Sequence, residues 1–197
     1  RKVGADLKPG DTVDLALGPA GYCGDRADGA DGSLNILTIS TVAPDPPPPR
    51  NAIADSQADW STTGTQGEKN WFYGYYDVRA DVETGDGVYS TGDFIPFLND
   101  GSSAVSVDPA IGGWKTTPNH WNGGGWDLLN NGVVQHGPWT ELGCAGGHPA
   151  ANAQGDPEVH WTVRRWVSTV AGDVQVSGTY NSAAPCGDGT VCRVLHN

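Results

Sequence analysis

The sequence has few basic side chains and no long apolar run, and these shortages exclude several classes of protein. Only 11 lysines and arginines stand against 23 acids, which gives a formal charge of −12 over 197 residues. Nucleic-acid-binding proteins and proteins held on anionic membranes need clustered basic residues, so we expect neither partner. No apolar run reaches the roughly 18–20 residues that a membrane-spanning helix requires. No secretory leader is present either, so we interpret the chain as a processed, secreted product found outside the cell or on its surface.

Common catalytic and zinc-binding motifs are missing as well. The sequence has no HExxH, no GxSxG and no CxxC pattern, which argues against zinc hydrolases, serine hydrolases and redox-active cysteines. A glycan-acting enzyme would need two facing carboxylates, one of them in an apolar setting. Glu158, next to the segment His-Trp-Thr-Val-Arg-Arg-Trp at 160–166, is the best single candidate for such a role. We name no catalytic residue from the sequence, and expect a protein that is not an enzyme.

Glycine, proline and alternating apolar residues are abundant instead, and they predict an all-β protein. The chain contains 29 glycines and 14 prolines, the composition of many short strands joined by turns. Alternation predicts strands at residues 11–17, 33–42, 190–196 and in a hairpin over 159–180. Residues 70–82 are rich in aromatic and β-prone side chains, and also predict a strand. We therefore expect a two-sheet, jelly-roll-like sandwich with long ordered loops.

The four cysteines are scattered, which favours disulfides over a metal site. Cys186 and Cys192 flank a glycine-rich turn and could close a hairpin. The remaining pair would be Cys23 with Cys144, which would join the piece before the proline run to the piece after it. The alternative is four free, buried thiols.

An acidic loop is the best candidate for a cation site. Asp25, Asp28 and Asp31 recur every third residue in a glycine-rich stretch. Calcium prefers six to eight oxygen ligands from carboxylates and loop carbonyls, so this loop predicts a calcium site. The spacing is not that of an EF-hand, and an ordinary turn in which each aspartate caps its own backbone is the alternative.

Aromatic side chains could form a platform for sugar rings on such a β-scaffold. The candidates lie in two aromatic stretches that also contain asparagine: Trp71, Tyr73, Tyr75, Trp121 and Trp126. An exposed row of such rings would indicate a binding surface, whereas the alternative is that most of them belong to the core.

Two further segments resemble a known kind of module. Residues 54–77 contain an Asp-x-x-x-Asp-aromatic-Ser opening and a Gln-Gly-x-x-Asn-Trp-x-Tyr-Gly-Tyr-Tyr strand, and residues 160–166 read His-Trp-Thr-Val-Arg-Arg-Trp. These motifs resemble β-sandwich modules, similar to carbohydrate-binding modules, in large secreted multidomain bacterial surface proteins. The resemblance implies a jelly-roll-like fold, and it implies little about activity.

The two halves of that module occur here in swapped order. By the resemblance, residues 1–42 correspond to the closing strands of a module and residues 54–197 to its main part, with a proline-rich linker at 43–53 between them. Three explanations stand: a permuted domain that closes on itself, one unit of a tandem array, or subunits that donate their first strands head to tail. An incomplete sandwich leaves an unpaired edge and an open core, which favours strand donation.

We therefore expect an extracellular, non-catalytic structural protein that associates with copies of itself, as a filament subunit assembled head to tail. A carbohydrate-binding module with glycan ligands is the alternative function, and a glycan-acting enzyme is the third.

Overall fold

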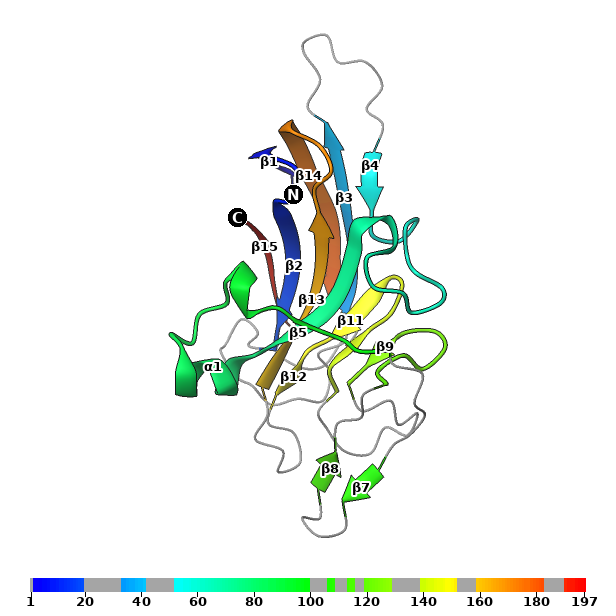
Figure 1. The fold of residues 1–197 in the computed structure, drawn as a ribbon, viewed down its shortest axis with the longest axis vertical. Coiled ribbons are helices and arrows are strands. Elements are labelled where there is room, and N and C mark those ends of the chain that lie inside the picture. The colour runs from blue at the N-terminus through cyan, green and yellow to red at the C-terminus, as the bar shows by residue number, and fades with distance from the viewer. Residues whose placement is uncertain are drawn as a thin grey trace.

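The computed structural model describes residues 2–19, 33–41, 52–99, 106–108, 113–115, 119–128, 139–151, 159–182 and 190–197. Two antiparallel sheets pack face to face as a sandwich (Figure 1), so the expected all-β sandwich is confirmed. Among these residues no helix is long and apolar enough to cross a membrane.

The first sheet has seven strands. In spatial order they are β1 (Lys2–Leu7), β14 (Gly172–Ser182), β3 (Ser33–Thr41), β11 (Gly146–His148), β10 (Glu141–Leu142) and β9 (Trp126–Asp127), with β4 (Ala52–Asp55) also paired to β3. The predicted strand at 33–42 is present, and β3 is central because it pairs with β14 along its whole length and with β4 and β11 on its other side. One face of β3 is buried, whereas Leu34 on the other face is 42% exposed.

The second sheet has six strands. Their order is β15 (Val191–His196), β2 (Thr12–Gly18), β13 (Val159–Val167), β5 (Trp71–Asp77) and β6 (Ile95–Pro96), with β12 (Ala150–Ala151) also paired to β13. A separate two-stranded ribbon consists of β7 (Ser106–Asp108) and β8 (Gly113–Lys115). The helical elements are α1 (Val78–Thr84) and two single 3₁₀ turns, Glu68–Asn70 and Thr91–Asp93.

The segment 159–180 does not form the predicted hairpin. Its two strands exist, but β13 pairs with β2 and β5 in one sheet whereas β14 pairs with β1 and β3 in the other. The connection between them therefore crosses from one sheet to the other. β13 is buried over most of both faces, which is typical of a central strand with neighbours on both sides.

The predicted strand over 70–82 ends early. β5 stops at Asp77, whose side chain accepts a hydrogen bond from the backbone nitrogen of Ala80 and caps α1. An aspartate at this position is a strong start signal for a helix and overrides the β propensity of the valines that follow. Earlier in β5, Gly74 lies so close to β6 that a Cβ there would come within 2.2 Å of the Ile95 carbonyl oxygen, so glycine is required at this strand contact.

The main core lies between the sheets, and a smaller one lies outside the second sheet. The large buried side chains of the main core include Trp71, Tyr73, Trp126 and Trp166. The smaller core forms where residues 78–94 cover the outer face of β2, β13 and β5, and it centres on Ala16, Tyr76, Tyr89 and Val163. Burying both faces of β2 in this way explains why every residue of that strand is inaccessible.

The strands β1, β2 and β3 pair with later strands of their own chain. β2 lies between β15 and β13, and β3 lies between β14 and the strands β11 and β4 (Figure 1). Both sheets thus depend on strands from each side of the proline run. Of the linker expected at 43–53, residues 52–53 begin β4 and the rest lie outside the described residues.

Candidate functional site

The motif residues that carried the resemblance build the fold. Asp55 accepts hydrogen bonds from the backbone nitrogens of Gln57 and Ala58, and Asp59 accepts one from the backbone nitrogen of Asp55, which fixes a tight turn after β4. The Gln66 side chain bonds the backbone nitrogen and oxygen of Tyr73 and so continues the pairing of β5. These polar side chains form hydrogen bonds with the backbone, and so they have a structural role.

The adjacent arginines of β13 point to opposite sides of the sheet. Arg165 lies on the outer side and makes two hydrogen bonds of 2.7 and 2.8 Å to the buried carboxylate of Asp14. Asp14 also accepts a hydrogen bond of 2.5 Å from the Tyr89 hydroxyl. This cluster ties the segment 78–94 to the sheet, and it satisfies the buried charge of Asp14 as a buried ion requires.

Arg164 points into the core, where it is 1% exposed. Its guanidinium donates to the Asn35 side chain at 2.9 Å and to the carbonyls of Gly143, Cys144 and Gly146. It also lies 5.1 Å from the ring centre of Trp60. Burial lowers the pKa of Arg164 to about 10. Arg164 of the second sheet thus binds the β10–β11 turn of the first sheet, and its side chain links the two sheets across the core.

Three of the five rings suggested for sugar stacking are core residues. Trp71 and Tyr73 are fully buried, and Trp126 is 1% exposed between neighbouring aromatic rings. Tyr75 is half-buried against Phe97 and His160. Trp121 is half-buried as well, with its ring packed on Trp126 and beside Gly64. The alternation of β5 directs Trp71, Tyr73 and Tyr75 to the core side, and the five rings do not form one exposed row.

The predicted cation loop and part of the predicted disulfides lie outside the described residues. This applies to Asp25, Asp28, Asp31, Cys23 and Cys186. Cys144 is exposed in the β10–β11 turn and Cys192 is half-buried on β15, and neither forms a disulfide within the described part of the chain. No group of three or more histidine, cysteine or carboxylate side chains is arranged for a metal ion in that part.

A hydroxyl–imidazole–carboxylate row passes through His160. Its Nδ1 lies 2.9 Å from the Thr140 hydroxyl, and its Nε2 lies 3.8 Å from an Asp77 carboxylate oxygen. The proximity of His160 lowers the pKa of Asp77. Thr140 and His160 are 0% and 2% exposed, so the row is buried, and it links β13 to the end of β5.

Two carboxylates lie side by side on neighbouring strands of the first sheet. Glu141 of β10 is directly opposite Asp127 of β9, and His148 of β11 is opposite Glu141 on its other side. Burial and the charge of Asp127 raise the pKa of Glu141 to about 7. An acid held protonated near neutral pH is a feature of some glycosidases. Because a raised pKa is also a contribution to stability, this pair makes the stability of the first sheet depend on pH.

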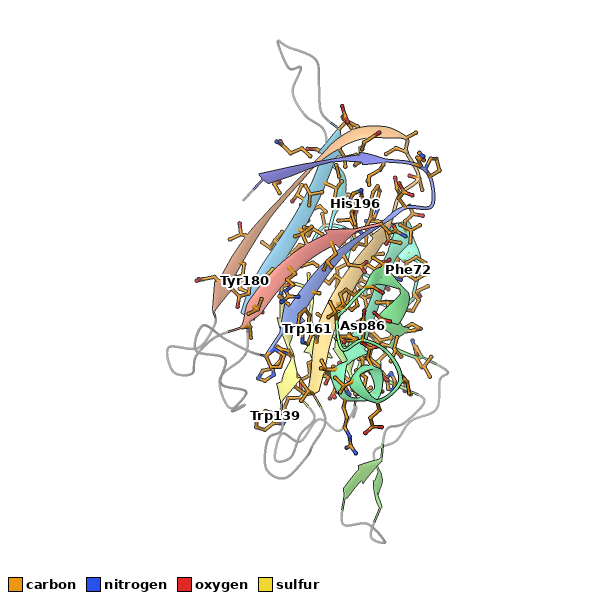
Figure 2. The ribbon with its side chains drawn as sticks, turned by 90° about the vertical axis from the view of Figure 1, so that its left-hand side faces the viewer. Phe72, Asp86, Trp139, Trp161, Tyr180 and His196 are labelled. Atoms are coloured by element: carbon orange, nitrogen blue, oxygen red, sulfur yellow. The ribbon has the colours of Figure 1, made fainter. Side chains whose placement is uncertain are left out.

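An apolar groove opens between β14 and β15, and it is the feature that best fits a binding site. Its volume is about 760 Å³. Its floor is formed by core residues such as Leu15 and Leu37, and its walls by Val176 of β14 and by Cys192 and Val194 of β15. Figure 2 looks onto this side, where β3 is seen between β14 and β15 and β1 crosses above them.

The side chains at this groove are exposed although they face between the sheets. Val194 lies on the same face of β15 as Cys192, two residues earlier, which packs on the main core, yet Val194 is 43% exposed. Tyr180 is 37% exposed, and its hydroxyl reaches across to the carbonyl of Thr190 at 2.9 Å. Residues facing between two complete sheets are normally covered, so the sandwich is open here.

Both rims of the groove are strand edges. β15 pairs with β2 on one side, and on its other side the described residues contain no strand. β1 runs beside β14 only as far as Ser177, so residues 179–182 of β14 extend beyond it and pair with β3 alone among the described strands. Exposed edges present backbone donors and acceptors that another strand can pair with.

Sequence reasoning did not find this groove. Residues 191–196 predict a strand, and they form one, but nothing in their composition indicates an edge position. That position follows from which strands become neighbours in space, and so from contacts between residues far apart in the chain.

Comparison with known proteins gives no relative: no family model, curated protein or solved structure matches the chain. The resemblance to secreted bacterial modules therefore stays a prediction from the quoted motifs.

Proposed function

We propose that this protein is a non-catalytic, extracellular structural module that associates with copies of itself by accepting a neighbour's β-strand in the groove between β14 and β15. The observation that supports this most is the exposure of Val194 and Tyr180 between the sheets, at a place where two strand edges face the same apolar groove.

A strand suits this groove better than a small apolar ligand. Apolar side chains of an added strand would cover the exposed core, and its backbone would pair with an edge that an apolar small molecule would leave unpaired. The acidic composition and the scattered cysteines favour a secreted setting, in which such assembly would occur.

The pairing of β1, β2 and β3 with later strands of their own chain limits the ways in which copies would join. Because β2 and β3 already pair on both sides with strands of their own chain, a chain folded in this way does not need the first strands of a neighbour. Exchange of residues 2–41 between copies remains a second route, since a swapped dimer would make the same contacts between different chains.

The expected affinity is modest. Twelve residues line the groove, against about 20–30 residues on each side of a standard stable interface. We therefore expect dissociation constants in the micromolar range. The formal charge of −12 makes copies repel one another at low ionic strength, so association should strengthen when salt is added.

Sedimentation velocity over a range of protein concentrations, with negative-stain images at the highest, tests this proposal. We expect concentration-dependent oligomers for the native chain and about a tenfold or greater weakening for Val194→Asp, since a charge would be placed in an apolar contact. Val82→Asp is the matched control, because Val82 is 64% exposed on α1 and does not line the groove. A native chain that is monomeric at every concentration, or equal weakening by both variants, would contradict the proposal.

A further inference from the structure

We propose that the β7–β8 ribbon of one copy is the element that fills the β14–β15 groove of the next copy. This donor assignment rests on the self-association proposed above. It identifies the partner as a second copy of this chain that presents a specific pair of strands.

The ribbon stands apart from the sandwich. β7 and β8 pair with each other and with no strand of either main sheet. In both views the ribbon projects from the base of the molecule (Figures 1 and 2). A two-stranded ribbon on its own is marginally stable in water, so packing against a further sheet would stabilise it.

The composition of the ribbon fits the groove. Its apolar residues, Val107 and Trp114, are opposite each other at its middle position. The ribbon strands contain one acid, Asp108, and one base, Lys115, so their net charge is zero in a strongly acidic protein. Electrostatic repulsion between two copies of this acidic chain therefore opposes the approach of the neutral ribbon less than it opposes the approach of an acidic part of the surface.

The charges along the acceptor edge complement the donor. β15 contains Arg193 and His196 and no acidic residue. Arg193 lies on the outer face, 4.8 Å from the ring centre of Trp161. β7 contains Asp108 and no basic residue, so the two strands carry opposite charges. Opposite charges on neighbouring strands favour pairing in one register.

The positions of ribbon and groove predict a head-to-tail assembly. Figure 2 shows the ribbon at a different part of the molecule from β14 and β15. Donor and acceptor are therefore different surfaces, so their contact is heterologous, and repetition without closure gives a filament.

Two complementary variants test the assignment. Trp114→Asp damages the donor and leaves the groove intact, whereas Val194→Asp damages the groove and leaves the ribbon intact. We expect each variant alone to associate at least tenfold more weakly than the native chain. An equimolar mixture should form a capped heterodimer of twice the 20.6 kDa chain mass, because one intact donor meets one intact acceptor.

The outcomes separate the donor assignment from self-association itself. If Trp114→Asp associates as the native chain does while Val194→Asp does not, the ribbon is not the donor and the groove remains the acceptor. If both variants are monomeric and their mixture is too, the pairing of ribbon with groove is overturned. If the native chain never associates, self-association fails and the donor assignment fails with it. Val107→Asp, with unchanged thermal unfolding as the check on folding, provides a second donor variant.

Discussion

Replacing Arg164 by methionine should destabilise the sandwich by about 3 kcal/mol. The guanidinium makes four hydrogen bonds across the core, to Asn35 and to three carbonyls of the β10–β11 turn. At the lower end of about 1.5–3 kcal/mol for hydrogen bonds to a charged group, they contribute roughly 6 kcal/mol. The burial that lowers the pKa of Arg164 to about 10 offsets about 3 kcal/mol of this, since one pKa unit is about 1.4 kcal/mol.

Urea unfolding followed by tryptophan fluorescence measures this loss, and thermal unfolding should show a decrease in Tm of roughly 6–12 °C for a chain of this size. Arg164→Lys should be no more stable than the methionine variant, because lysine keeps the charge without the planar set of donors. Arg79→Met is the matched control: Arg79 is 53% exposed and pairs with Glu83 on the surface, so its loss should cost under about 0.5 kcal/mol. A loss of less than about 1 kcal/mol in the free energy of unfolding of Arg164→Met would refute the proposed role of this side chain in linking the two sheets.

Three further predictions concern pH, calcium and disulfides. Burial and the charge of Asp127 raise the folded-state pKa of Glu141 from 4.5 to about 7, so the stabilising contribution of the Glu141 side chain is complete below pH 4.5 and is lost as the pH rises through 7. Relative to Glu141→Gln, the free energy of unfolding of the native chain should fall by up to about 3 kcal/mol by pH 8. Parallel pH profiles for the two chains would contradict this. If Asp25, Asp28 and Asp31 bind calcium, added Ca²⁺ should raise Tm in the native chain and not in a triple asparagine variant, whereas no shift on adding a chelator would exclude the site. Non-reducing peptide mapping should detect Cys186–Cys192 and Cys23–Cys144; free thiols at all four positions would disprove both bonds.

Local patterns in the sequence were enough to predict the strands, but not their neighbours. The alternation in 11–17 and 33–42 gave two strands that the structure contains as β2 and β3. The segment 159–180 gave two strands as well, but a short connection suggested a hairpin, and the chain instead crosses between sheets. Turn residues report local backbone geometry, and they do not report which sheet receives the next strand.

The same limit applies to the candidate site. The aromatic motif in β5 suggested rings that could bind a sugar, but it did not indicate which of them are buried. Trp71 and Tyr73 are buried in the core. The adjacent arginines also differ in a way that the sequence does not indicate: Arg164 lies over Trp60 in the core, whereas Arg165 pairs with the buried Asp14 and lies over Phe94. The groove depends on where β1 ends beside β14 and on the edge position of β15, which are contacts between distant parts of the chain.

Hydrogen exchange at the groove edges tests the central claim most directly. Amide exchange of residues 179–182 and of β15 should be compared at protein concentrations below and above the association midpoint. We expect these amides to become protected at high concentration in the native chain and not in Val194→Asp, because an added strand pairs with a free edge. Oligomers that leave these amides unchanged, and protect another edge such as β9 or β6, would contradict the assignment of the groove as the acceptor.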